Sequence, residues 1–321
     1  MLGIRRRLQA RGIMGINARN GDYVLRYNRR HLYPLVDDKV LTKKRAMEVG
    51  IRVPEQFAVI ETEQQIKGFA RILGERKDFV IKPAQGAGGD GILVITDKFE
   101  GLYRTASGRL LTLDDIEHHL SGILSGIYSL GGYRDKALVE YRVIPDDVFG
   151  AISFEGVPDI RLIVLRGYPV MGMLRLPTRQ SQGKANLHQG AIGVGVDLAT
   201  GVTLGGTWHN RIISRHPDTT NPVAGVQLPD WQEFMTLASG CYELTGLGYI
   251  GVDLVLDKDQ GAMMLEINAR PGLNIQIAND DGLMRRCELV EAHIAERQRQ
   301  GLKRPPVEER VAFSQQHFAI Q

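Results

Sequence analysis

The residues with the clearest chemical potential lie in the run EINARPG, residues 266–272, which follows the apolar residues 263–265. The run places an acid, an amide and a guanidinium at alternate positions, as Glu266, Asn268 and Arg270. Successive residues of a strand point to opposite faces, so these three side chains share one face. The run therefore predicts a strand end with one buried face and one face that presents ligands for cations and anions.

An acid in the preceding apolar run, residues 249–257, completes this set. If the hairpin turns at Asp259 and Gln260, Asp253 lies directly across from Glu266, with Cβ atoms about 5 Å apart. In this register Met263 lies on the opposite, apolar face. Two carboxylates and an amide oxygen suit Mg²⁺, and two such ions about 4 Å apart clamp a polyphosphate. The alternative is a surface hairpin with a hydrated polar face.

A second candidate site is the run FVIKPAQGAGGDG, in which Lys82 ends an apolar strand. The glycines that follow it are Gly86, Gly88, Gly89 and Gly91. Glycine permits positive φ and close backbone approach, so successive N–H groups of this loop can surround phosphate oxygens while the lysine adds charge. The Gly-Lys-Ser/Thr ending of a Walker loop is absent. The alternative is a mobile hairpin turn beside an uninvolved lysine.

Composition bounds the class of protein. The chain has 321 residues, 43% of them hydrophobic, and a net charge of only +3, which does not favour a nucleic-acid partner. Cys241 and Cys287 have no metal-like or redox-like spacing, and no apolar run is long enough for a membrane helix. We expect a cytoplasmic protein. The basic start MLGIRRRLQARGIMGI favours a solvated arm over a short amphipathic helix.

The elements expected from hydrophobic periodicity alternate in blocks. We expect helices over 37–50, 63–74, 113–130, 230–245 and 281–300. We expect strands over 78–83, 91–96 and 137–144, and hairpins around 160–176 and 249–269. Helices mixed with largely antiparallel strands predict an α+β protein rather than a doubly wound one.

Taken in order, these pieces resemble the ATP-grasp superfamily, in particular the RimK-type α-L-glutamate ligases and their D-alanine–D-alanine ligase relatives. The resemblance covers about residues 38–280. It rests on the thirteen-then-two spacing of Asp253, Glu266 and Asn268, and on the segments DIRLIVLRGYPVMGMLRL and KANLHQG. It implies an ATP-grasp fold, in which two α+β subdomains clasp ATP. The implied domains are a short basic N-terminal region (1–38), a subdomain with helices and the glycine lid (39–140), a C-terminal subdomain with the metal site (141–300) and a tail (301–321).

The resemblance also implies roles for individual residues. ATP phosphates would be contacted by Lys39 and Lys82, with Gly86 to Gly91 as a flexible lid. Adenine would be held by Glu140, Tyr141 and Val143, and ribose by Asp147. Two Mg²⁺ or Mn²⁺ ions would be bound by Asp253, Glu266 and Asn268. Arg161 and Arg175 would line the reaction centre, Arg270 would hold an oxyanion or a carboxylate, and Asn186 and His188 would contact substrate.

Two of these assignments have structural alternatives. With a turn near Tyr168, Arg161 and Arg175 would face each other across two strands, which requires an anion between them. A substrate anion is favoured, and a buried carboxylate, for which Asp159 is the nearby choice, is the alternative. His188 either contacts substrate or caps a carbonyl.

The implied activity is that of an ATP-dependent carboxylate–amine ligase, which joins glutamate or another amino acid to an amino acid or peptide through an acyl phosphate. The alternatives are a non-catalytic ATP-binding sensor or partner module and a kinase of the same fold. Ligases of this kind usually have a longer N-terminal domain, whereas 38 residues precede Lys39 here. A homo-oligomer and a protein partner on the basic N-terminal residues are both compatible with the sequence. No general base stands out.

Overall fold

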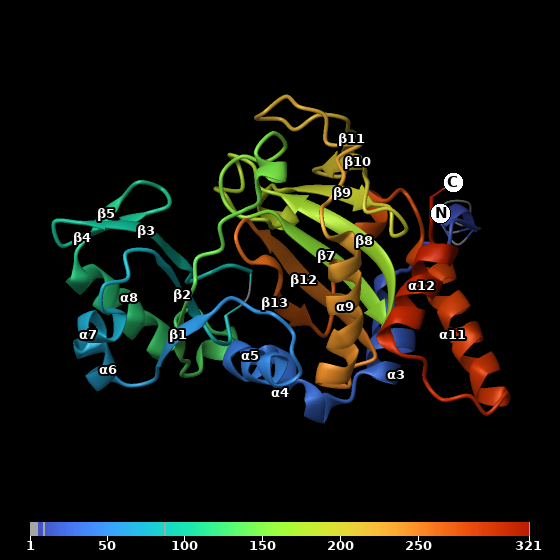
Figure 1. Ribbon diagram of the computed structural model, residues 1–321, viewed down its shortest axis with the longest axis horizontal. Coiled ribbons are helices and arrows are strands. Elements are labelled where there is room, and N and C mark those ends of the chain that lie inside the picture. Colours follow the sequence, from blue (N-terminus) through green and yellow to red (C-terminus); the bar gives the residue numbers. More distant parts are fainter. Residues whose placement is uncertain (1–5, 9, 87, 321) are drawn as a thin grey trace. The chain divides into compact units, whose positions relative to one another are not determined.

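The computed structural model describes residues 6–8, 10–86 and 88–320. The described chain forms two compact units. Unit 1 comprises the residues up to Val36, Arg45–Arg52 and the chain from Pro145 onward. Unit 2 comprises Asp37–Lys44 and Val53–Ile144. Each unit contains one antiparallel sheet with helices packed against it, which confirms the expected α+β class (Figure 1).

Unit 2 is built on a six-stranded sheet in the order β1-β6-β2-β3-β4-β5. Its strands are β1 (Gln56–Ile60), β2 (Phe79–Pro83), β3 (Leu93–Phe99), β4 (Leu102–Thr105), β5 (Leu110–Leu111) and β6 (Ala137–Glu140). Its helices are α6 (Glu63–Lys67), α7 (Phe69–Leu73), α8 (Leu113–Leu124), the short η3 (Leu130–Gly132) and the first part of α5 (Lys39–Glu48). Because β6 pairs with β2, Lys82 lies across from Leu138, and Glu140 at the end of β6 lies two residues further along on the same face of the sheet.

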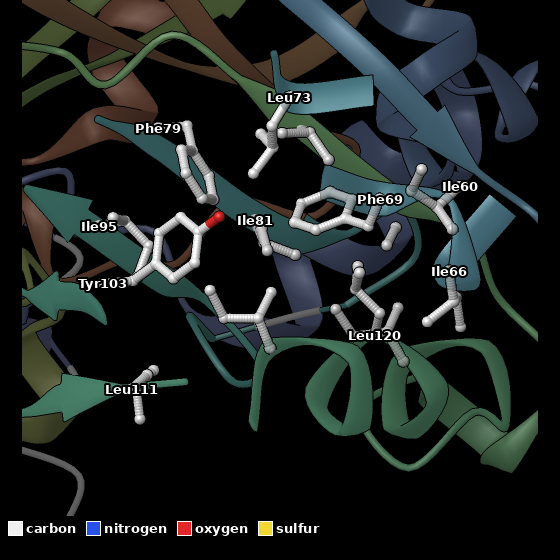
Figure 2. Close-up of a cluster of buried hydrophobic side chains, with 14 residues drawn as sticks. Ile60, Ile66, Phe69, Leu73, Phe79, Ile81, Ile95, Tyr103, Leu111 and Leu120 are labelled. Atoms are coloured by element: carbon white, nitrogen blue, oxygen red, sulfur yellow. The ribbon is translucent and has the colours of Figure 1, made fainter. Parts of the chain in front are cut away.

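The core of unit 2 packs α6, α7 and α8 onto one face of this sheet (Figure 2). Phe79 of β2 stands between Phe69 and Tyr103, with ring centroids 6.1 Å away on both sides and edge-to-face geometry. All three aromatic side chains are buried. Burying a side chain of this size contributes about 1.5–3 kcal/mol, so this face fixes β2 firmly in the sheet.

Unit 1 contains a seven-stranded sheet in the order β11-β10-β9-β8-β7-β12-β13. Its strands are β7 (Asp159–Leu165), β8 (Tyr168–Leu176), β9 (Ile192–Val196), β10 (Thr203–Trp208), β11 (Arg211–Ile213), β12 (Tyr249–Asp257) and β13 (Gly261–Asn268). Its longer helices are α9 (Trp231–Thr245), α11 (Leu283–Arg299) and α12 (Val307–His317), all of which contact the sheet or one another. Its short helical segments are α2 (Ile16–Ala18), η1 (Arg19–Val24), α3 (Leu25–Tyr27), η2 (Arg30–Leu32), α4 (Pro34–Asp37, which ends in unit 2), η4 (Asp147–Phe149), η5 (Leu187–Gln189) and α10 (Ile275–Ala278).

Most of the expected elements are present. Asp38 accepts from the backbone N–H groups of Val40 and Leu41 at 2.9 and 3.1 Å, as expected for the start of the helix after residue 37. The helix expected over 63–74 is two helices separated at Gly68, and the one expected over 113–130 ends at Leu124. The strand expected over 137–144 ends at Glu140. The short strands β1, β4, β5 and β9–β11 and the helix α12 were not expected.

The N-terminal residues are packed into unit 1, so the expected solvated arm is wrong for the part from Gly12 onward. Met14, Tyr23 and Val24 are buried. The side chain of Asn28 joins the ends of two strands, because its Nδ2 donates to the carbonyl oxygens of Tyr249 and Ala269 at 2.7 and 2.9 Å. Residues 12–28 thus cover the open end of the β12–β13 hairpin. Among the residues that the structure describes, no helix has both the length and the apolar character needed to span a membrane.

Candidate functional site

The β12–β13 hairpin carries the first candidate cluster, in unit 1. Asp253 lies directly across from Glu266, as predicted, and Asn268 pairs with Gly251. The turn comprises residues 258–260 rather than Asp259 and Gln260 alone, because Asp257 pairs with Gly261. An extra residue near Leu265 compensates for this difference and restores the predicted pairing. This bulge changes the alternation, so Met263 lies across from Val255 and not on the face that was predicted for it.

Asp253 is buried and bound by two arginines of neighbouring strands. Arg161 donates through Nε and Nη2 to the two carboxylate oxygens at 2.6 and 2.5 Å, which is a bidentate pair. Nη2 of Arg175 donates to Oδ2 at 2.7 Å. β12 pairs with β7 so that Asp253 is opposite Arg161, which explains the close approach.

The predicted direct pairing of Arg161 with Arg175 is wrong. Arg175 lies opposite Asp159, and Arg161 lies opposite Met173, because the β7–β8 hairpin turns at Arg166 and Gly167. Arg175 also forms a bidentate ion pair with Asp159. The anions between the two arginines are therefore carboxylates of the chain itself, which was the alternative interpretation for Arg175.

The electrostatics of this cluster are unbalanced. Three carboxylates, Asp159, Asp253 and Glu266, surround two guanidinium groups, so the formal sum is one negative charge. Burial opposes ionisation of Asp253, but Arg161 and Arg175 outweigh burial and hold its pKa well below the usual range. Burial also raises the pKa of Asp159, against the opposing effect of Arg175. The excess of acid favours a cation beside Asp253 and Glu266.

The donor set fits a hard divalent cation. The amide Nδ2 of Asn268 lies 3.3 Å from Oδ2 of Asp253 and 3.3 Å from Oε1 of Glu266, so the three side chains converge. A flip of that amide presents its oxygen to the same point. Within the described residues no three or more His, Cys, Asp or Glu side chains are arranged so that they could hold a metal ion together, so an ion here requires the amide as its third protein ligand.

The second cluster lies in unit 2 and contains two lysines that share one carboxylate. Glu140 at the end of β6 is buried, and its Oε1 lies 2.5 Å from Nζ of Lys82 on β2. Its other oxygen accepts from Nζ of Lys43 on α5. Lys39, one helical turn before Lys43, donates from Nζ to the carbonyl oxygen of Gly86 at 2.7 Å. The structure thus brings one predicted phosphate-binding lysine, Lys39, to the first glycine of the loop, which follows the other, Lys82, in the chain.

Lys43 was missed by sequence reasoning. Its side chain is 1% exposed, and Nζ also donates to the carbonyl oxygen of Pro54 at 2.9 Å. Burial lowers the pKa of Lys43 from 10.5 to about 8, although Glu140 opposes the shift. Burial alone would raise the pKa of Glu140, but Lys82 and Lys43 lower it. The available signal was the i, i+4 spacing of Lys39 and Lys43, which places both on one helix face.

The glycine loop has the backbone that its sequence predicts. Gly88, Gly89 and Gly91 adopt positive φ, between 70° and 82°. At Gly86 an added Cβ would lie 2.3 Å from Pro83, so this position needs glycine for space. Nothing in the structure tests the predicted flexibility of the lid.

The residues predicted to hold the nucleoside lie in both units. Tyr141 and Val143 follow β6 in unit 2, where the N–H of Tyr141 donates to the carbonyl oxygen of Glu55 at 2.8 Å. Glu140, which was also predicted to contact adenine, pairs with Lys43 and Lys82. Asp147 lies on η4 of unit 1 and pairs with Lys258 at 2.9 Å, with 82% of its side chain exposed.

Three other predicted residues lie at the edges of unit 1. Asn186 caps η5, and its Oδ1 accepts from the backbone N–H of His188 at 3.0 Å. The His188 side chain is exposed. Arg270 follows β13, and its guanidinium carbon lies 5.3 Å from the ring centre of Tyr33. Arg270 has no carboxylate within 4.0 Å among the described residues, in contrast to Arg161 and Arg175.

Comparison with solved structures gives remote similarities. The ATP-grasp ligase PsnB complexed with a minimal precursor shares 15% identity over 84% of this chain and 63% of its own, with a TM-score of 0.45. A RimK domain ATP-grasp protein from Sphaerobacter thermophilus shares 17% identity over 79% of this chain and 69% of its own, with a TM-score of 0.42. For D-alanine–D-alanine ligase from Bacillus anthracis the values are 14%, 84%, 71% and 0.43. The chain thus spans about three-fifths of the PsnB structures.

No curated protein matches the chain. The family model of sugar-transfer associated ATP-grasp proteins matches residues 18–292, a range that includes both clusters. This match confirms the ATP-grasp superfamily and fold that the sequence motifs indicated. The chain belongs to the sugar-transfer associated ATP-grasp family.

Proposed function

We propose that this protein is an ATP-dependent carboxylate–amine ligase, which uses ATP with Mg²⁺ to activate a carboxylate and join it to the amine of an amino acid or peptide. The observation that carries the proposal is the convergence of Asp253, Glu266 and Asn268 on one hairpin beside Arg161 and Arg175. Family membership supplies the expectation of ATP as the co-substrate.

The two clusters have opposite signs, as the two parts of a magnesium nucleotide require. In unit 1, Asp253, Glu266 and Asn268 would hold Mg²⁺ or Mn²⁺, one or two ions, which neutralises charge on the phosphates. In unit 2, Lys82 and Lys39 would contact the phosphates, together with backbone N–H groups of the glycine loop that follows Lys82. Tyr141 and Val143 would contact adenine, and Asp147 the ribose.

The chemistry follows from the poor electrophilicity of a carboxylate. Transfer of the γ-phosphoryl group forms an acyl phosphate with release of ADP, and attack by the amine then forms the amide with release of phosphate. Nε and Nη2 of Arg161 are engaged by Asp253, which leaves Nη1 for the oxyanion. One well-placed donor of this kind is worth about 3–4 kcal/mol. Arg175, which is paired with two acids, would act mainly by holding Asp253 in place.

The test measures ADP release by the purified full chain with Mg²⁺ and a panel of amino acids and peptides. We expect amine-dependent ADP release, an amide product in the mass spectrum and a loss of at least 100-fold in Glu266→Gln. Asp259→Asn removes an exposed acid at the turn of the same hairpin and serves as the control, with unchanged turnover.

Other outcomes identify the alternatives. A stable phosphorylated product without amine would indicate a kinase. Binding of ATP with no turnover in the presence of any substrate would indicate a nucleotide-binding partner module. Either result would overturn the ligase proposal.

A further inference from the structure

A small pocket in unit 1 lies beside the hairpin cluster, and Arg270 is the one lining residue for which the sequence analysis predicted a role. The pocket has a volume of about 360 Å³ and is lined by Arg19, Asn20, Val24, Leu25 and Arg270. Arg270 follows Asn268 by two residues on the same segment. The other four residues belong to the N-terminal region, which the fold packs against the end of this hairpin.

Two guanidinium groups in this pocket are held in place by neutral partners. Nη1 of Arg19 donates to the carbonyl oxygen of Pro271 at 3.0 Å, and its Nε and Nη2 donate to Oδ1 of Asn20 at 3.0 and 2.7 Å. Arg270 lies over the ring of Tyr33. Within the described ranges neither arginine has a carboxylate within 4.0 Å, so two positive charges share the pocket without a counter-ion. Two cationic side chains without a carboxylate partner give the pocket a positive charge that suits an anionic ligand.

The backbone conformation at Arg19 also favours a functional role for this pocket. Arg19 begins η1, a six-residue π-helix, and π-helical segments are rare and frequently occur at functional sites. Val24, at the end of η1, is buried, and the next residue, Leu25, is 66% exposed. The pocket therefore combines two cationic groups with an apolar wall.

We propose that this pocket binds the carboxylate group of an amino-acid or peptide substrate, the one that is not activated, together with a small apolar side chain. The inference rests on the proposed ligase function for the identity of the anion. Arginine pairs with carboxylates through two parallel hydrogen bonds, and its fixed guanidinium plane orients the ligand. The volume lies at the lower end of small-molecule sites, which suits one end of a substrate rather than a whole large ligand.

The test is calorimetric titration of the full chain with the twenty L-amino acids and their amides, with and without a non-hydrolysable ATP analogue. We expect at least one free amino acid to bind, and its amide to bind at least 10-fold more weakly because the carboxylate is missing. Inorganic phosphate is a separate titrant. Phosphate that binds as tightly as the amino acid would overturn the assignment to a carboxylate.

Variants locate the binding. Arg270→Gln and Arg19→Gln should each weaken binding by at least 10-fold, whereas Arg211→Gln, which removes an exposed arginine of β11, should leave it unchanged. Because Arg19 also bonds to the backbone, Leu25→Glu is a second probe that adds a negative charge at an exposed position of the wall and should weaken binding to a similar extent.

Three results contradict the pocket. These are the absence of any amino-acid binder, equal affinity for acid and amide, and wild-type affinity in all three pocket variants. The ligase proposal can fail separately. Carboxylate binding without amine-dependent ADP release would retain the pocket and refute ligation, whereas full turnover with wild-type KM in the pocket variants would retain ligation and refute the pocket.

Discussion

The carboxylate cluster of unit 1 and the lysine cluster of unit 2 are both buried ion networks, but they leave excess charge of opposite sign. In unit 1 three acids face two arginines, and in unit 2 two lysines face Glu140. A network that served stability alone would be balanced, because an uncompensated buried charge is costly. The imbalance supports the proposal that a cation completes the cluster in unit 1 and a phosphate the cluster in unit 2.

The largest loss of stability is expected from Asp253→Ala, which removes the acid that Arg161 and Arg175 share and leaves Asp159 and Glu266 as the remaining acids. We expect the free energy of unfolding to fall by about 4–5 kcal/mol, since removal of one partner of a buried pair exposes the cost of the others. Urea unfolding followed by circular dichroism measures it. A loss below 1 kcal/mol would show that the network is hydrated and not buried.

A smaller effect is expected from Glu140→Gln, which leaves Lys43 and Lys82 without their shared acid. The expected loss is about 3 kcal/mol by the same measurement. Adding Lys43→Met to this variant removes one of the two lysines and should restore part of the loss. If the double variant is less stable than Glu140→Gln alone, repulsion between Lys43 and Lys82 is not the cause of the loss in Glu140→Gln.

The pH dependence of stability tests the protonation of the buried Lys43. Its pKa is about 8 in the folded protein and 10.5 when unperturbed, so between these values the unfolded state binds more protons. The stability of the wild type relative to Lys43→Met should therefore rise with pH from 8 to 10, by about 1.4 kcal/mol per unit at most. The charged groups that face Lys43 are Glu140 and Lys82. A flat difference would mean that Lys43 remains charged throughout this range.

The smallest effect is expected outside both networks. Lys258 pairs with Asp147 at 2.9 Å, but both side chains are at least half exposed. Exposed pairs contribute little because water and salt screen them. Lys258→Ala should leave the melting temperature unchanged. A clear decrease would show that this exposed ion pair contributes to stability as the buried pairs do.

The sequence predicted the parts of the site that depend on local pattern. The predicted pairing of Asp253 with Glu266 is confirmed, but it depends on the extra residue near Leu265, which the sequence analysis did not predict. Positive φ in the glycine loop followed from its composition. The arginine pair was placed wrongly because the position of the β7–β8 turn fixes its register, and one residue decides which side chains are neighbours. Such a shift leaves no mark in the hydrophobic pattern.

Lys43 and the N-terminal packing could not be predicted for a different reason. A lysine on a polar helix normally faces solvent, and only the tertiary position of Glu140 shows that this one is buried. Likewise, the basic residues around Arg11 suggested an arm, while the buried Met14, Tyr23 and Asn28 bind to strands more than 200 residues away in sequence. Long-range contacts of this kind are invisible to periodicity.

The extra residue near Leu265 has a consequence for how this hairpin tolerates change in length. If that residue were deleted, the rest of β13 would continue the pairing seen from Asp257 to Leu254, and the acid now at 266 would follow Met264 directly and still lie across from Asp253, on the ligand side. The hairpin should thus tolerate the loss of one residue at this point and keep Asp253 and Glu266 opposite each other, whereas the insertion of a further residue there would move Glu266 away from Asp253.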